Sequence, residues 1–342
     1  MVIRYFRDLT SISVPIVRDW GLTLEAIHKG QDLSDLLQQP TETKEDAIVQ
    51  DPNIDNAKLD FVYEQIAGFM LELSRVEFPR IGAISQNATS GQRDVTRRPL
   101  TYDINEVVTL APFNFVSHLF AARAQSFQVH LEAQRNIAGD GGNLAWNQFV
   151  ARHYFARMVS TQDTVNETGP FRLFCNGLRP TNMLADSETL RISSVLDFEF
   201  TNAMPAQFAD DVPWWLLLQK PAVWISEGKV QEFLTLLQPR KEQFIQAMER
   251  VECKSPLATE ETMGTFDSTS HYGVISFDID EIYWKVLHKG NLGEALLDSA
   301  TLGEKEASVR RKKAQLDAYR SEKESDQRFA GQWWLVIRES TQ

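Results

Sequence analysis

The chain has 342 residues, of which 43% are hydrophobic and 24% charged, and its formal net charge is −12. This composition is typical of a globular protein and excludes a fibrous, disordered or disulfide-stapled chain. The acidic balance argues against binding to nucleic acid or an anionic membrane over the whole surface. The length allows two domains, or one large domain with lobes.

The cysteine content and the apolar segments indicate a cytoplasmic location. The sequence has two cysteines, Cys175 and Cys253, which suits a reducing compartment. Residues 1–17 lack the apolar core of a signal peptide. The most apolar run, residues 214–218, is far shorter than the roughly 20 residues of a membrane-spanning helix. We therefore expect a soluble, cytoplasmic protein with no nucleic-acid or membrane partner.

Short elements are predicted along the first 57 residues. A helix is expected at 4–9, a strand at 13–20, and a second helix at 32–38 that ends before a proline. Residues 40–57 are acidic and contain two prolines. This segment is interpreted as a linker or exposed loop.

A long amphipathic helix is predicted at 57–76. Its apolar residues recur at spacings of three and four, which places them on one face of a helix. They are Leu59, Val62, Ile66, Phe69 and Leu73. The polar stretch 83–103 follows, and its arginines are interpreted as part of a solvated loop.

Beyond residue 111 the pattern predicts helices around a β-rich centre. The predicted helices span 112–134, 143–160, 230–250 and 276–288. The predicted strands span 171–174, 182–185 and 192–200, with turn residues between them. Residues 304–328 are helical in propensity but mostly charged, so we expect a solvated outer helix there. The fold class predicted from this order is α+β.

The β-rich centre carries the residues with the clearest chemical potential. Asn182 opens one predicted strand and Asp197 ends another, so a hairpin would bring both side chains to the same end of the sheet. Glu199 could lie on the same side. Asn and Asp oxygens suit a hard cation such as Mg²⁺, which takes one or two carboxylates together with substrate phosphates. The alternative is that Asn182 and Asp197 are ordinary turn residues.

Two short segments carry a family resemblance: residues 175–182 read CNGLRPTN, and residues 196–199 read LDFE. They resemble the catalytic and metal loops of the aminoglycoside phosphotransferase/choline kinase-like family, which has the protein-kinase-like fold. In that family the loops read His/Cys-x-Asp-Leu-x-Pro-x-Asn and Ile-Asp-Trp/Phe-Glu. The likeness to a fungal branch of phosphotransferase-like proteins extends over residues 7–17, 78–84, 98–101, 200–218 and 283–284.

The resemblance implies a particular domain organisation. It predicts a protein-kinase-like fold with a truncated small N-lobe and a mainly helical C-lobe that carries a central β-hairpin. Residues 1–39 would be the remnant of the N-lobe and residues 40–57 an acidic linker. Residues 58–330 would form the C-lobe, followed by a tail at 331–342.

Several parts of the family's machinery are expected to be missing. Phosphoryl transfer needs a phosphate cover, a Lys held by a Glu, metal ligands, and a base for the accepting hydroxyl. The base position is Gly177, flanked by Cys175, Asn176 and Arg179 in the same loop. A Gly-rich turn is absent, and the Lys and its Glu would lie before Met1, so a gene start further upstream could restore them.

The retained residues and the losses lead to two main hypotheses. The resemblance implies Mg²⁺ and ATP as cofactors and carries the metal-ligand role over to Asn182 and Asp197, with Glu199 as a third candidate. The missing parts argue against ATP binding. The first hypothesis is therefore a degenerate phosphotransferase, and the second is an active ATP-dependent phosphotransferase in which Asp210 or Asp211 replaces the base.

Other features leave alternatives open. A hydrolase built on Cys175 would need a nearby histidine such as His153 or His271, and the sequence places neither beside it. Two aromatic groups could line a cleft for an acceptor or could pack between helices. They are Trp214, Trp215 and Trp224, and Tyr283 and Trp284. The small-molecule acceptor, or a protein partner, is not identified by any motif.

Overall fold

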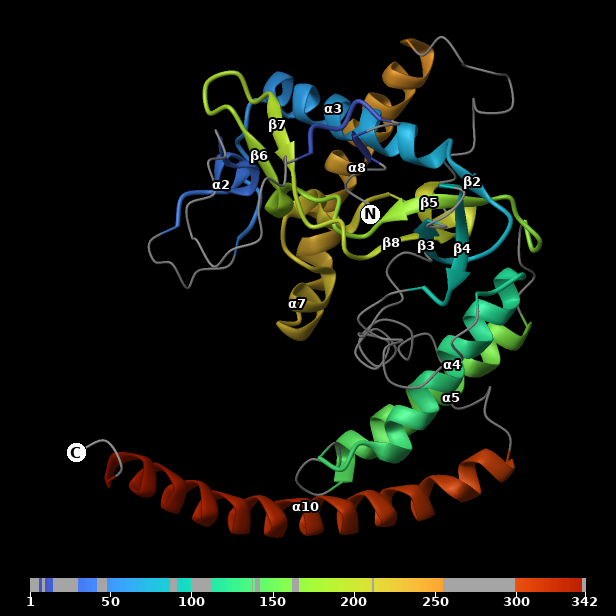
Figure 1. Cartoon of the computed structure of the whole chain (residues 1–342), viewed down its shortest axis with the longest axis vertical. Helices are drawn as coiled ribbons and strands as arrows, with labels where there is room; N and C mark the ends of the chain where they lie inside the picture. The colour runs from blue at the N-terminus through green and yellow to red at the C-terminus, as the bar shows by residue number, and fades with distance from the viewer. Residues whose placement is uncertain are drawn as a thin grey trace. The chain divides into compact units, whose positions relative to one another are not determined.

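The computed structural model describes residues 6–7, 10–14, 30–41, 48–86, 91–99, 112–136, 138, 142–161, 166–210, 212–254 and 299–339. The described chain mixes helices and sheets, so the α+β fold class is confirmed (Figure 1). It divides into two compact units. Unit 1 comprises Met1–Leu119 and Asp163–Ser276, and unit 2 comprises Phe120–Gln162 and Phe277–Gln342.

The described residues of unit 1 form two antiparallel sheets. The three-stranded sheet has the order β1 (Gln31–Asp32), β6 (Met183–Ala185) and β7 (Ile192–Val195). The five-stranded sheet has the order β2 (Glu77–Phe78), β5 (Phe171–Cys175), β8 (Thr201–Met204), β3 (Gly82–Gln86) and β4 (Arg93–Arg97). The predicted central hairpin is present as the β6–β7 pair, in which Met183 lies opposite Val195.

Of the helical elements described in unit 1, three were predicted from the sequence, at 33–37, 56–74 and 230–254, whereas the four short ones between residues 180 and 226 were not. In chain order these seven elements are α2 (Leu33–Leu37), α3 (Asn56–Ser74), the 3₁₀ turn η2 (Pro180–Asn182), α6 (Ala206–Asp210), the 3₁₀ turn η3 (Trp214–Leu217), α7 (Pro221–Ser226) and α8 (Val230–Lys254). The N-terminus of α3 is fixed by Asp55, whose carboxylate accepts hydrogen bonds from the backbone amides of Ala57 (2.8 Å) and Lys58 (3.0 Å). Such a cap satisfies amides that have no partner within the helix.

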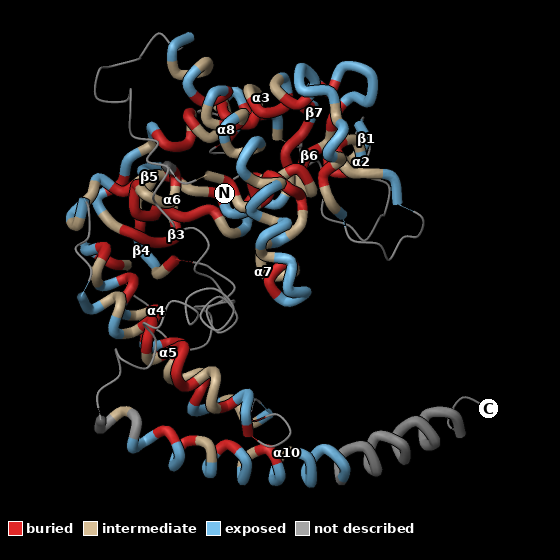
Figure 2. Tube along the Cα trace, turned by 180° about the vertical axis from the view of Figure 1, so that it is seen from behind, coloured by how far each residue is buried: buried red, intermediate tan, exposed pale blue. Residues whose placement is uncertain are grey.

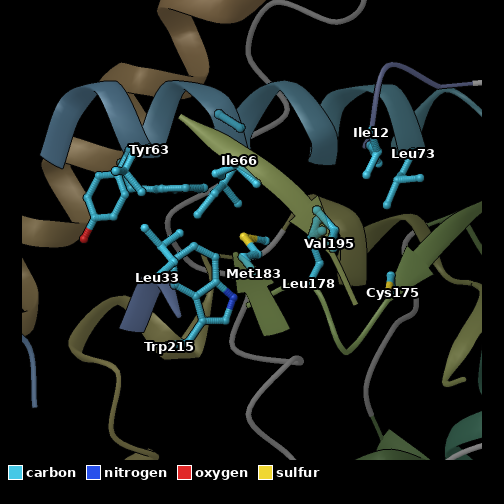
Figure 3. Close-up of a cluster of buried hydrophobic side chains, with 14 of the residues drawn as sticks. Ile12, Leu33, Tyr63, Ile66, Leu73, Cys175, Leu178, Met183, Val195 and Trp215 are labelled. Carbon is cyan, nitrogen blue, oxygen red and sulfur yellow. The ribbon is translucent and has the colours of Figure 1, made fainter. Parts of the chain in front are cut away.

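The core of unit 1 lies between α3 and the three-stranded sheet. Figure 3 shows Ile66 projecting from α3 toward the strands that carry Met183 and Val195, and the Tyr63 ring meets the Phe244 ring edge to face with centroids 5.3 Å apart. Of the predicted apolar stripe, Leu59, Val62, Ile66 and Leu73 are buried and Phe69 is half-buried. Burying each such side chain fully stabilises the fold by about 1.5–3 kcal/mol. The periodicity therefore identified the core face of α3 correctly.

The sequence-based predictions for two β segments were wrong. Part of the stretch interpreted as a loop, 83–103, forms a β3–β4 hairpin in which Ile84 pairs with Val95. Its polar residues hid the alternation because the hairpin buries one face only. The strand predicted at 192–200 ends at Val195, and β8 then joins the other sheet.

Several predicted N- and C-terminal elements can be compared only in part. The described part of the predicted linker 40–57 is attached to its surroundings, since Gln50 is buried and its amide donates to the Leu217 carbonyl (3.1 Å). An exposed loop is therefore the wrong description of Gln50. Of the predicted helix 4–9, Phe6 and Arg7 are helical. Most of the predicted strand 13–20 and all of the helix 276–288 lie outside the described residues.

The described residues of unit 2 form three helices. It contains most of α4 (Val116–Ala133), together with α5 (Asn143–Thr161) and α10 (Ser299–Glu339). The rings of Phe127 in α4 and Phe155 in α5 meet edge to face with centroids 5.4 Å apart. The Nζ atom of Lys305 in α10 lies 3.4 Å from the ring centroid of Trp146 in α5, a cation–π contact.

The prediction of a solvated outer helix at 304–328 was wrong for its first half. Residues spaced by three and four along α10 are buried, and Figure 2 shows them alternating with exposed residues. These are Lys305, Ser308, Lys312 and Leu316. The sequence pattern did not predict this buried face because three of its four residues are polar. The helix also continues to Glu339, so no change of backbone conformation marks the predicted tail at residue 331.

Lys312 attaches α10 to the end of α4. Its side chain is fully buried, and Nζ donates to the carbonyls of Glu132 (2.6 Å) and Gln134 (3.1 Å) and to the Gln315 side-chain oxygen (2.6 Å). Carbonyls at a helix C-terminus lack partners within the helix and attract a cation. Burial is the main cause that lowers the pKa of Lys312 to about 8.

The lowered pKa of Lys312 predicts a pH-dependent contribution to the stability of unit 2. Between pH 8 and about 10.5 the folded chain has lost this proton while the unfolded chain retains it. Unfolding then takes up a proton, so the stability of the wild type relative to Lys312→Met should rise with pH across this window. Urea unfolding of both proteins from pH 7 to 10.5, read by hydrogen exchange in α10, would measure the rise. A constant difference between the two proteins would contradict the prediction.

Candidate functional site

Two of the residues predicted to form a metal site, Asn182 and Asp197, come together at one end of the β6–β7 hairpin. The Asn182 Nδ2 atom donates to the Gly177 carbonyl (2.9 Å) and to the Asp197 carboxylate (3.2 Å). The backbone amide of Leu196 donates to the Asn182 carbonyl (2.8 Å). The loop at 176–179, which follows β5, and the loop at 196–199, which follows β7, are therefore linked through a single asparagine.

These hydrogen bonds also orient the Asn182 side chain. Because Gly177 presents a carbonyl, the amide nitrogen must face it, and the amide oxygen Oδ1 is directed to other contacts. The carboxylates of Asp197 and Glu199 are exposed, whereas Phe198 between them is buried. Asp197 has a positive φ of 59°, a conformation that Asp tolerates better than most residues.

A cation at this site would have few protein ligands. Among the residues that the structure describes, no three His, Cys, Asp or Glu side chains gather closely enough to hold a metal ion. The donors that remain are the Asn182 oxygen and the Asp197 carboxylate, with the exposed Glu199 two residues further along the chain. That set suits Mg²⁺, which is commonly bound through one or two carboxylates and keeps several waters.

Gly177 is packed against the second loop without room for a side chain. A Cβ atom on its backbone would lie 2.1 Å from the Asp197 carbonyl oxygen and 3.4 Å from Asn182 Nδ2. Real Cβ atoms do not approach a backbone oxygen so closely, so any side chain here would displace the Asp197 loop. The position predicted for the base is thus occupied by the backbone of the loop that carries Asp197.

The remaining loop residues do not supply a nucleophile. Cys175 is buried, and burial raises the pKa of its thiol to about 11, whereas a reactive cysteine needs its thiolate. His153 lies in unit 2, where its ring stacks on Phe149, and His271 lies outside the described residues. The geometry therefore gives no support to a hydrolase built on Cys175.

A small apolar pocket adjoins this loop on the side of β5. Its walls come from β5 and the loop at 176–179, from α3, and from residues 208–209 and 212–215, and its volume is about 60 Å³. Cys175, Asn176, Phe208, Trp214 and Trp215 are among the lining residues. Since one water takes about 30 Å³ of liquid volume, the pocket has room for a water or two but not for a metabolite.

The aromatic residues mainly pack within unit 1. Trp215 is buried against Phe244, with ring centroids 5.9 Å apart, and the Arg179 guanidinium lies 5.7 Å from the Trp214 ring centroid. Trp224 is also buried. The described tryptophans therefore do not line a wide acceptor cleft beside Asp197. Tyr283, Trp284 and Asp211 lie outside the described residues, and the side chain of Asp210 is not described.

The sequence did not indicate a role for Phe6, which packs against Phe198 in the loop that carries Asp197. Phe6 is fully buried, and its ring lies 4.4 Å from that of Phe198, centroid to centroid. The same segment is held in place by Ser11, which bonds to Glu72 in α3, and by Ser13, whose carbonyl accepts from the Val195 amide (2.8 Å). The only sequence signal was an aromatic residue in a predicted short helix.

Comparison with known proteins assigns the chain to no family. No protein-family model matches the chain, and neither a curated protein nor a solved structure matches it significantly. Within the described part of the chain, every helix is too short or too polar to cross a membrane.

Proposed function

We propose that this chain is a phosphotransferase-like protein with a kinase-like C-lobe that has lost phosphoryl transfer. The observation that carries the proposal is the packing at Gly177. A positioned base raises the rate by roughly 10²–10⁴-fold, and here the Asp197 carbonyl occupies the space that the side chain of such a base would need. In this backbone, a side chain at position 177 would overlap the loop that carries Asp197. That loop, with its metal-ligand candidates, would have to move to accommodate it.

The order of the elements supports the proposed kinase-like architecture. The loop at 175–182 connects β5 to β6, and the LDFE segment follows β7 directly, so both motifs meet at one end of a hairpin. Phe198 packs against Phe6 near the N-terminus. In protein kinases the equivalent aromatic of the metal loop is likewise held by packing that sets its position.

The same site supports a second part of the proposal, the binding of a divalent cation. Asn182 is already oriented by its two hydrogen bonds, so its amide oxygen loses little freedom when it becomes a ligand. Asp197 and Glu199 add exposed carboxylates. We therefore propose that the protein keeps a weak Mg²⁺ site and has a binding role rather than a catalytic one.

Titration with Mn²⁺, which replaces Mg²⁺ and is detected by electron paramagnetic resonance, tests the cation site. We expect Asp197→Asn to weaken Mn²⁺ binding by at least about tenfold, because it removes the central carboxylate. The control is Glu188→Gln, which removes an exposed carboxylate from a turn outside the site. Equal binding by the wild type and Asp197→Asn would contradict the proposed site.

Turnover of Mg·ATP tests the loss of catalysis. We expect no formation of ADP above the rate of the uncatalysed reaction, with or without hydroxyl compounds such as choline or sugars. Turnover that disappears in Asp197→Asn would overturn the proposal and favour the alternative, an active ATP-dependent phosphotransferase acting on a small-molecule hydroxyl.

A further inference from the structure

The loop at 176–179 begins with an Asn-Gly pair, Asn176 and Gly177, and this pair occurs nowhere else in the sequence. In such a pair the backbone nitrogen of the glycine can attack the side-chain amide of the asparagine. Every other residue type carries a Cβ atom that hinders this approach, whereas glycine allows close contact with its backbone. The pair is therefore open to chemical modification wherever the folded structure leaves both reacting groups available.

The Asn176 side chain is available because it is exposed and forms no hydrogen bond. Its neighbours Cys175 and Gly177 are buried, whereas Asn176 is exposed. No residue in the described part of the chain bonds to its amide. In contrast, the amide nitrogens of Asn182 and Asn202 donate to the carbonyls of Gly177 and Phe200. The Asn176 side chain is thus able to rotate between its rotamers, and its Cγ atom can approach the next residue.

The Gly177 nitrogen is available as well. Its N–H is directed to the sulfur of Cys175, and a thiol is a weak acceptor. No oxygen in the described part of the chain accepts from it, whereas the amides of Leu178 and Arg179 donate to the carbonyls of Cys175 (3.2 Å) and Gly177 (2.9 Å). The Gly177 nitrogen can therefore lose its proton and bond to Asn176 without giving up a hydrogen bond to oxygen. Cys175 and Leu178, which flank the pair, are both in the core (Figure 3).

We propose that Asn176 is a site of spontaneous deamidation through a cyclic imide with Gly177. The Gly177 nitrogen attacks the Asn176 Cγ atom, the bond between Cγ and Nδ2 breaks, and ammonia leaves with the proton of the Gly177 amide. Water then opens the ring at one of its two carbonyl carbons. Opening at Cγ gives aspartate, and opening at the backbone carbonyl gives isoaspartate, in which the main chain runs through the side-chain carbon.

The packing around Gly177 makes the two products unequal. Aspartate leaves the backbone unchanged and adds an exposed carboxylate. Isoaspartate lengthens the main chain by one carbon directly before Gly177, where even a Cβ atom would lie 2.1 Å from the Asp197 carbonyl oxygen. Isoaspartate therefore breaks the bond from Asn182 to the Gly177 carbonyl (2.9 Å) and loosens the loop that carries Asp197. Neither the reaction nor this consequence depends on the proposed function.

Ageing of the full-length protein under native conditions at mildly alkaline pH, followed by peptide mass spectrometry, tests the reaction. We expect the amide of Asn176 to become an acid at least about tenfold faster than that of Asn166, because the residue after Asn166 has a Cβ atom. Asn166 is the matched control, since it is also an exposed residue in a turn. Asn176→Gln should abolish the change, because glutamine would have to form a larger ring. A rate at Asn176 no greater than that at Asn166 would overturn the proposal.

Hydrogen exchange in peptides from residues 192–204 tests the consequence. Isoaspartate in the aged protein is quantified by enzymatic methyl transfer to its carboxylate, and the exchange should become faster in proportion to it. Asn176→Asp supplies the aspartate product alone and should exchange like the wild type. If protein rich in isoaspartate exchanges no faster than Asn176→Asp, the proposed effect on the Asp197 loop is wrong.

Discussion

Replacing Gly177 with aspartate is expected to destabilise unit 1 by about 3 kcal/mol, as a severe case of overpacking, and to leave the protein without ATP turnover. The Asp Cβ would overlap the Asp197 carbonyl. That carbonyl cannot move alone, because the neighbouring Leu196 amide is bonded to Asn182, whose side chain is in turn bonded to Gly177. The substitution would thus restore a carboxylate while it displaces the metal-ligand candidates.

Chemical unfolding followed by hydrogen exchange in peptides from residues 171–204 would measure this effect. Gly177→Ala separates the steric cause from the charge, and we expect it to destabilise nearly as much as the aspartate. Gly303→Ala is the matched control, since nothing lies within 4 Å of a Cβ built there, and alanine within a helix should stabilise it by about 0.5–1 kcal/mol. A stable Gly177→Asp protein that turns over ATP would refute the steric explanation and show that the base was the only defect.

Phe6→Ala is expected to destabilise unit 1 by about 3–5 kcal/mol, the usual cost of removing a buried phenylalanine ring. Phe6 is fully buried against Phe198, so the substitution leaves a cavity beneath the Asp197 loop. We further expect weaker Mn²⁺ binding, because Phe198 fixes the segment that carries Asp197 and Glu199. A folding defect alone would lower stability without changing the affinity of the folded fraction.

Mn²⁺ titration under strongly native conditions, combined with hydrogen exchange, distinguishes these effects. Phe61→Ala is the control, since Phe61 lies on α3 and is 42% exposed, and surface substitutions usually change stability by less than about 0.5 kcal/mol. Unchanged Mn²⁺ affinity in a folded Phe6→Ala protein would show that the N-terminal segment stabilises the fold without positioning the site.

Local patterns in the sequence predicted the elements that bury apolar residues at a regular spacing. Helix α3 was expected at 57–76 and spans Asn56–Ser74, and α5 was expected at 143–160 and spans Asn143–Thr161. The hairpin argument also predicted that Asn182 and Asp197 would meet, and their side chains lie within hydrogen-bonding distance. These features depend on residues close in sequence, for which spacing determines which side chains share a face.

Other features depend on contacts between distant segments, which no local pattern contains. The buried stripe of α10 consists mainly of lysines and serine, and Lys312 is buried because the end of α4 offers it carbonyl acceptors. The β3–β4 hairpin is polar along most of its length, so it was predicted as a loop. In both cases the element packed against the segment determines which of its residues are buried. The composition of the segment alone therefore leads to the wrong prediction.

The sequence by itself determined the α+β class, the main helices, and the presence of an amide and a carboxylate at one end of a hairpin. It also showed that residue 177, the position expected for the base, is a glycine, which has no side chain that could act as a base. Only the tertiary structure decided that the backbone of Asp197 fills the space beside Gly177, that Phe6 supports Phe198, and that Asn176 is exposed between two buried neighbours. The physical reason is that steric exclusion and exposure depend on which distant backbone and side-chain atoms are brought together, and spacing along the chain does not specify those contacts.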